Sequence, residues 1–151
     1  MEIKNAELQG RVASAPSVRS ESETRHFFKG CHRIMKLSTL IHNIVPDAGA
    51  YVRAAQAKDW DELTRLRKLH NGRKDPAYQI TYQTAMQLLN VLFRQFSEHK
   101  YAYDGETLIA LLEEVGFRQA TVTSFGQSRM AELAIDLEQR ASESLYVEAV
   151  R

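Results

Sequence analysis

The sequence predicts an α/β domain with a small sheet and a large helical content, and three observations support this fold class. Three short segments are rich in branched apolar residues, as strands are: Leu40 to Val45, Ala120 to Thr123 and Ser144 to Val150. Segments with helical periodicity lie before and between them, and such alternation indicates an α/β layer. The chain has 151 residues, which is enough for one domain with its own core. Three or four strands make an unusually small sheet.

The helix with the clearest sequence signals begins after Asp104 and ends at Gly116. The Asp104 side chain can accept a backbone N–H of the first turn, and Gly116 can adopt the left-handed conformation that ends a helix. Phe117 can then fold back on the last turn. Four apolar residues recur at the spacing of one buried helix face: Leu108, Leu111, Leu112 and Val115.

Five further helical segments are predicted from caps and periodicity. Ser20 with Glu23 has the capping-box spacing and predicts a helix to about Lys36. A short helix begins near Ala48. A second capping box, Asp59 with Glu62, predicts a helix that ends at Asn71-Gly72.

The longest predicted helix runs from about Gln79 to Glu98, after a loop at Lys74-Asp75-Pro76. Its expected apolar face is Tyr82, Ala85, Met86, Leu89, Leu92, Phe93 and Phe96. Ser128 is expected to open a last helix, which carries Met130, Leu133, Ala134 and Leu137 on one side.

The predicted organisation is a flexible arm at residues 1–19, with a possible short strand from Ile3 to Leu8, followed by a single domain at residues 20–151. Within that domain, residues 48–98 form a helical insertion. A net charge of +1 argues against a dedicated nucleic-acid binder, and no apolar run is long enough for a membrane span. The N-terminus has no signal-peptide pattern, and Cys31 is the single cysteine, so we expect a cytoplasmic protein without an internal disulfide.

No familiar catalytic motif occurs, and the five histidines have no spacing that would share a metal ion on one helix face. Arg65 to Lys74 is the one concentration of basic residues; it could contact phosphate, although a solvated helix face is favoured. Tyr82, Phe93 and Phe96 could line a pocket, but core packing is favoured. His99 to Asp104 places an imidazole, two phenols and a carboxylate within six residues, which is where chemistry is expected, and the alternative is a capped helix with packed aromatics.

Two parts of the chain resemble class I S-adenosylmethionine-dependent methyltransferases. Cys31 to Lys36, followed by an apolar strand that ends in Val45-Pro46-Asp47, is similar to the family's CHRxLKPGG…VPD passage. His99 to Asp104, with Thr107-Leu108, Leu111-Leu112, Gly116-Phe117 and the terminal Glu143 to Ala149, is similar to the C-terminal half of the same enzymes. The resemblance covers about Phe27 to Arg151.

The chain also departs from the family pattern. Leu37-Ser38-Thr39 stands where the family has Pro-Gly-Gly, and residues 1–25 contain neither the glycine-rich cofactor loop nor the acidic residue that holds the cofactor ribose. The resemblance therefore implies a partial Rossmann-like methyltransferase sheet, namely strands five, six and seven in the order five, seven, six, with a helical lid. It implies a truncated or split protein.

The resemblance implies S-adenosylmethionine as cofactor, with binding dependent on a partner or an oligomer, and an unknown methyl acceptor. The expected substrate-side residues are Pro46, Asp47, His99, Tyr101, Tyr103 and Asp104. Without its inner neighbour, Leu40 to Val45 would be an apolar edge, which we expect the arm, a second copy or a partner chain to cover. The alternative is a non-enzymatic interaction or oligomerisation module derived from this fold.

Overall fold

The computed structural model of the chain describes residues 19–151. The arm predicted for residues 1–19 therefore lies outside the described residues, except for Arg19. The described part is an α/β structure with a three-stranded sheet, in which β1 (Leu40–Pro46), β5 (Ser144–Val150) and β4 (Arg118–Thr123) lie in that order. The last strand of the chain therefore lies between the other two.

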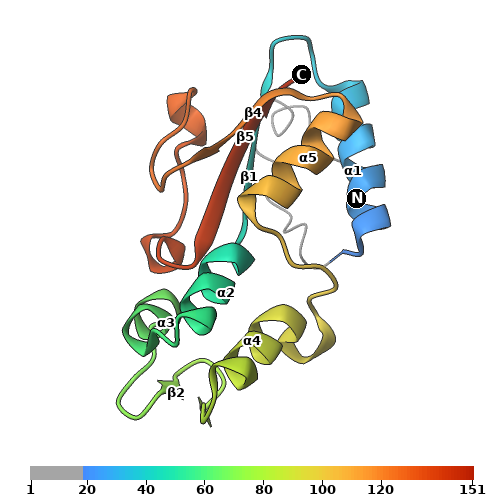
Figure 1. Cartoon of the computed structure of the whole chain (residues 1–151). Coiled ribbons are helices and arrows are strands. Elements are labelled where there is room, and N and C mark those ends of the chain that lie inside the picture. The colour runs from blue at the N-terminus through green and yellow to red at the C-terminus, as the bar shows by residue number, and fades with distance from the viewer. Residues whose placement is uncertain (1–18) are drawn as a thin grey trace.

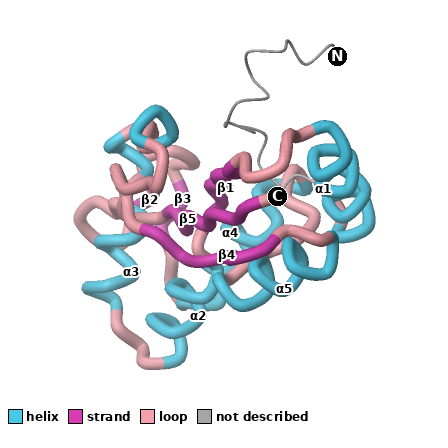
Figure 2. The backbone as a smooth tube through the Cα atoms, turned by 90° about the horizontal axis from the view of Figure 1, so that it is seen from above, coloured by secondary structure: helices cyan, strands magenta, loops and turns pink. Residues whose placement is uncertain are grey.

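The central strand β5 is antiparallel to both of its neighbours, and its register fixes two faces of the sheet (Figures 1 and 2). His42 and Thr121 both lie opposite Glu148, so these three side chains share the outer face. Asn43 and Val122 both lie opposite Val147 on the inner face. Every residue of β1 is buried or half-buried, as predicted for a strand covered on both faces.

Helices α1 (Glu21–Ile34) and α5 (Gly105–Val115) cover the inner face, on the right of the sheet in Figure 1. Both predicted N-caps are confirmed: Ser20 and Glu23 form a capping box, and the Asp104 side chain accepts from the Thr107 N–H at 2.8 Å. Gly116 ends α5 at φ 111°. The first core joins these helices to the sheet, and it includes Phe28, Ile41, Val45, Leu108, Leu112, Phe117 and Val147.

Residues 48–98 form a second hydrophobic core of their own, in the lower half of Figure 1. Helices α2 (Ala48–Gln56), α3 (Trp60–Arg67) and α4 (Ala85–Arg94) surround it, together with a hairpin of β2 (Lys74–Asp75) and β3 (Ile80–Thr81) and the 3₁₀ turn Gln95–Ser97. Its fully buried members are Tyr51, Leu63, Leu66, Tyr82 and Leu88. The insertion therefore packs on itself.

The predicted helix from Gln79 to Glu98 is wrong at both ends. Thr84 forms the capping box with Gln87 that starts α4, and Gln95 adopts a left-handed φ of 36° that ends it. The residues before Thr84 belong to the hairpin, because the Asp75 carboxylate accepts the Ala77 N–H at 2.8 Å and so turns the chain. The predicted loop at Lys74-Asp75-Pro76 is correspondingly a short strand followed by a turn.

Two further helix predictions, the burial of Met86 and the end of α3, also differ from the structure. Met86, placed on the buried face of the long helix, is 63% exposed, because the shorter helix buries Leu88, Leu89 and Leu92 instead. Helix α3 ends at Arg67 rather than at Asn71-Gly72. Lys68 adopts the left-handed conformation there, and the N–H of the buried Leu69 donates back to Thr64.

The helix predicted to open at Ser128 is absent from the described structure. The segment between β4 and β5 instead crosses the outer face of the sheet with two short 3₁₀ turns, Ala131–Leu133 and Glu138–Arg140. Two contacts hold this segment on β5. The Arg129 N–H and guanidinium donate to Glu148, and the Tyr146 hydroxyl donates to Asp136 at 2.7 Å. These tertiary bonds outweigh the weak local preference for a helix.

Candidate functional site

The carboxyl end of β1 is where the structure gathers the residues predicted for chemistry. Helix α2 begins there after Asp47, whose carboxylate accepts the Ala50 N–H at 2.9 Å. The loop segment that leads into α5 passes alongside, since Asp47 and Tyr103 form an isolated parallel bridge and the Ala48 N–H donates to the Tyr103 carbonyl at 3.0 Å. Pro46, Asp47, Tyr103 and Asp104 are therefore neighbours in this structure.

The N-termini of α2 and α5 meet at Gly49. A Cβ on this glycine would lie 3.0 Å from the Asp104 Cβ, 3.3 Å from an Asp47 oxygen and 2.9 Å from the Arg53 guanidinium. Glycine therefore allows the two capping aspartates to approach each other. The bonds from Thr107, with a smaller contribution from the charge of Arg53, hold the pKa of Asp104 below its usual value. Asp104 stays ionised as a cap and is unsuited to accept a proton at neutral pH.

The three ring residues continue this site. The rings of Tyr101 and Tyr103 lie 4.9 Å apart, and the His99 Nδ1 lies 2.9 Å from the Leu92 carbonyl oxygen of α4. His99 thus ties the site to the insertion. The Tyr103 ring is 1% exposed; burial raises the pKa of its hydroxyl, which has no hydrogen-bond partner of normal geometry within residues 19–151.

The space between these residues is very small. Pro46, His99, Tyr101 and Tyr103, with residues of α2 and α4, line a cavity of about 10 Å³. A single water molecule needs at least this volume. In this arrangement the predicted site is a packed junction between sheet and insertion, where the side chains can orient a neighbouring group but enclose no substrate.

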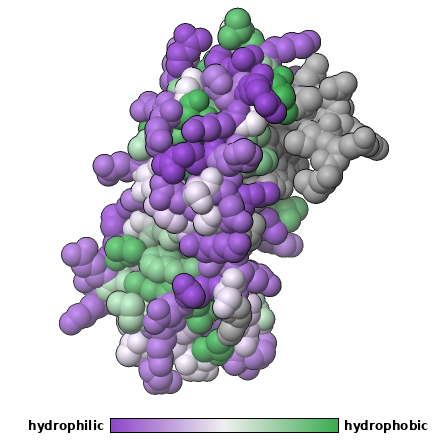
Figure 3. All heavy atoms as spheres, turned by 90° about the vertical axis from the view of Figure 1, so that its right-hand side faces the viewer, coloured by the Kyte–Doolittle hydropathy of each residue, from purple (hydrophilic) through white to green (hydrophobic). Residues whose placement is uncertain are grey.

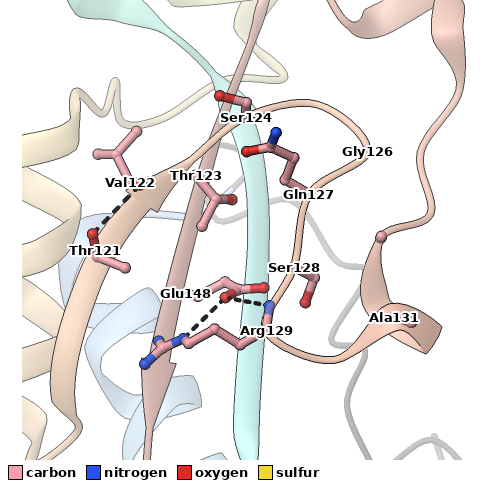
Figure 4. A pocket seen from close by; sticks show the side chains of 11 residues that line it. Thr121, Val122, Thr123, Ser124, Gly126, Gln127, Ser128, Arg129, Ala131 and Glu148 are labelled. Atoms are coloured by element: carbon pink, nitrogen blue, oxygen red, sulfur yellow. Dashed lines mark hydrogen bonds and ion pairs between the residues drawn. The ribbon is translucent and has the colours of Figure 1, made fainter.

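Sequence reasoning missed a buried charged network on the outer face of the sheet. Glu148 on β5 is fully buried, and one of its carboxylate oxygens lies 3.0 Å from the His42 Nδ1 of β1. The other oxygen accepts the Arg129 N–H at 3.3 Å and the Arg129 Nε–H at 3.2 Å (Figure 4). One carboxylate thus joins two strands and the segment that follows β4.

Burial alone would raise the pKa of Glu148, but hydrogen bonds from Ser128, His42 and Arg129 outweigh it and leave the pKa below its usual value. The carboxylate is therefore ionised at neutral pH and holds the loop on the sheet. A signal for this network existed in the sequence: His42 and Glu148 interrupt otherwise apolar strands, where a charged residue requires a partner.

A second network fixes the insertion to the sheet. Arg67 of α3, 15% exposed at its side chain, bonds the buried Asp75 at 2.8 Å and Glu143, next to β5, at 3.1 Å. The Tyr82 hydroxyl donates to the same Asp75 at 2.9 Å. Burial would raise the pKa of Asp75, but the bonds from Arg67 and Tyr82 lower it, so the pair stays charged.

Several basic side chains of the cluster from Arg65 to Lys74 already bond other groups of the protein. This favours a structural role for the cluster over phosphate binding. Arg65 pairs with Glu62 at 2.6 Å, Arg67 is in the network just described, and the Arg73 guanidinium lies 3.7 Å above the Trp60 ring. Lys68 donates to the Gln139 carbonyl. These side chains do not form a common cationic surface.

No three His, Cys, Asp or Glu side chains within residues 19–151 are placed to hold one metal ion. None of the helices in this part of the chain combines the length and apolar character needed to cross a membrane.

Comparisons with known proteins give a distant likeness among solved structures. A scan against protein-family models finds no match, and neither does a search of the curated proteins. Among solved structures, the chain is similar to a SAM-dependent methyltransferase from Archaeoglobus fulgidus, with 13% sequence identity and a TM-score of 0.49. The match covers 95% of this chain and 59% of that chain. At this identity and TM-score, the likeness by itself assigns no activity to the present chain.

Proposed function

We propose that these 151 residues are the substrate-side part of an S-adenosylmethionine-dependent methyltransferase, and that polypeptide outside them supplies the cofactor-binding strands. The observation that carries this proposal is the sheet order β1, β5, β4, which is the order that the sequence motifs implied. The sequence has no glycine-rich loop of the kind that approaches a dinucleotide-like cofactor, so the cofactor site must be completed elsewhere.

The edge of β1 is the place where the missing strands would pair. The Asp47 N–H donates to Glu143 and the Arg151 N–H to Thr39, so the odd-numbered positions of this strand bond β5. The backbone groups of the even-numbered positions, such as Ile44, point to the opposite edge. Pro46 fits this alternation, because it has no N–H to donate there. Within residues 19–151, no strand pairs with that edge.

Methyl transfer depends mainly on the alignment of donor and acceptor, so the site needs positioning groups more than a strong base. Pro46 and Asp47 lie at the carboxyl end of β1, where open α/β sheets bind ligands. His99 and Tyr101 are the substrate-side positioning residues in this proposal, and Tyr103 and Asp104 hold the α5 entry in place. Access for a substrate requires the insertion to move away from the small cavity that these residues line.

The test is to recover the assembly that contains this chain from its own cells under mild conditions and to crosslink it with radiolabelled S-adenosylmethionine. We expect label on the polypeptide that adjoins β1, and none on the isolated 151-residue chain. The variant Ile44→Pro removes an outward N–H and should prevent assembly while leaving the circular dichroism spectrum unchanged. An assembly that contains the chain but takes up no label would refute the proposal.

In an active assembly, His99→Ala and Tyr101→Phe should lower kcat/KM. Unchanged rates would remove both residues from the site.

The second candidate is a non-enzymatic interaction module, and the observation in its favour is the closed junction at the carboxyl end of β1. A cavity of about 10 Å³ leaves the isolated chain without room for a methyl acceptor. The crosslinking experiment separates the two functions, because a pure interaction module would join the same assembly through β1 and acquire no cofactor label.

A further inference from the structure

A groove in the surface of the insertion is distinct from the site at β1. It runs between α2, the start of α3 and the start of α4, and it has a volume of about 660 Å³, within the range of small-molecule sites. Figure 3 shows apolar surface on this lower half of the molecule. The apolar residues that line the groove are Val52, Ala55, Trp60, Ala85, Met86 and Leu89.

Two of these apolar side chains are exposed to solvent although they face the groove. Val52 is 43% exposed and Met86 is 63% exposed. Their burial by a ligand would be favourable, at about 25 cal/mol per Å² of apolar area. Methionine is also an adaptable contact, because its unbranched side chain can follow ligands of different shape. The groove therefore favours an apolar chain.

The charge of the residues that line the groove indicates which head group a ligand would carry. None of its lining residues is acidic, and Lys58 is the one that is cationic. Within residues 19–151 the Lys58 ammonium makes no ion pair or hydrogen bond, unlike Arg65 and Arg67 nearby. Arg73 does not line the groove, and its guanidinium lies 3.7 Å from the centroid of the Trp60 ring. An anionic group is thus complementary to the groove at Lys58.

We propose that this groove binds an amphiphile with an apolar chain and an anionic head group, such as a medium-chain carboxylate. The chain lies along Val52, Met86 and Leu89, and the head group pairs with Lys58. The inference does not rest on the proposed methyltransferase function, since the groove belongs to the core that the insertion forms by itself.

Trp60 lines the groove and is the only tryptophan of the chain, so its fluorescence reports binding directly. The probes are decanoate and decyltrimethylammonium, which share a chain and differ in charge, each kept below its micelle concentration. We expect saturable decanoate binding that is about tenfold tighter than that of the cation, the ratio for roughly one charge-assisted hydrogen bond.

Variants identify the groove as the binding place. Lys58→Gln should abolish the preference for decanoate, and Met86→Ser should weaken both probes without loss of folding. The matched controls are Lys29→Gln and Leu37→Ser, which change an exposed cation and an exposed apolar residue elsewhere. Equal affinity of the two probes, no Trp60 response to either, or weakening by the controls to the same extent would each overturn the proposal.

Discussion

Replacement of the fully buried Glu148 by glutamine tests how the outer face of the sheet is held together. Glutamine keeps the size of the side chain but removes the charge. It also places an amide nitrogen where one oxygen accepts hydrogen bonds from His42 or Arg129. The loop after β4 and the strand β1 would therefore both lose a charged acceptor.

The expected loss of stability follows from these contacts. The Arg129 guanidinium is 40% exposed, so its ion pair with the carboxylate is screened and counts for little. Glutamine keeps one acceptor oxygen, so only one of the bonds from His42 and the Arg129 N–H remains, and it falls from charge-assisted to neutral strength, a loss of about 1 kcal/mol. One buried donor left without an acceptor adds about 1–3 kcal/mol. The free energy of unfolding should drop by about 2–4 kcal/mol, and Tm by about 5–15 °C.

Urea denaturation followed by far-UV circular dichroism is the suitable assay, because Trp60 fluorescence reports the insertion rather than the sheet. Glu138→Gln, an exposed carboxylate on the same loop, is the control and should change stability by less than about 0.5 kcal/mol. The pKa of Glu148 is lowered on folding, so its contribution is present above the unfolded pKa, about 4.3, and is lost as pH falls through the folded value. A difference between wild type and E148Q that is absent at pH 7, or that does not shrink as the pH falls below the unfolded pKa, would refute this reasoning.

Three further predictions concern the junction at β1 and the insertion. Asp104→Ala should destabilise the chain by about 1 kcal/mol through loss of the α5 cap, and Asp104→Asn should not, as measured by urea denaturation. Gly49→Ala should lower the free energy of unfolding by about 1–2 kcal/mol, because the new Cβ would crowd the two capping aspartates. The control Gly30→Ala places its Cβ in open space within a helix and should raise the free energy of unfolding by about 0.5–1 kcal/mol. Equal effects of the two substitutions would contradict the crowding at Gly49. Asp75→Asn should cost about 3 kcal/mol, because Arg67 would lose its buried carboxylate partner and keep only the more exposed Glu143, and Trp60 fluorescence should follow this loss; an unchanged transition would exclude the network as an anchor.

Local signals were reliable where several of them agreed within one turn of chain. The predicted caps of α1 and α5, the glycine that ends α5, and the three strands of the sheet are all present. A capping side chain bonds an N–H two or three residues away, so its partner is already in the local sequence. The extent of apolar periodicity was less reliable: it merged the hairpin before Thr84 with α4 and placed Met86 on a buried face.

The candidate site was likewise predictable only in part. The resemblance of the sequence motifs indicated six substrate-side residues: Pro46, Asp47, His99, Tyr101, Tyr103 and Asp104. It gave no measure of the space between them, which depends on how α4 and His99 pack against the sheet. The roles of Arg67 and Arg73 were also unpredictable in detail, since their partners Asp75, Glu143 and Trp60 are brought to them only by folding.

The sequence by itself determined the α/β class, the strands and the well-capped helices, because hydrophobic periodicity and capping act over a few residues. Only the tertiary structure decided the pairing of His42 and Arg129 with Glu148, the attachment of the insertion through Arg67, and the apolar groove beside Trp60. These features join residues that are distant in sequence, and the energy that selects them, desolvation of charges and burial of apolar surface, exists only once the chain has folded.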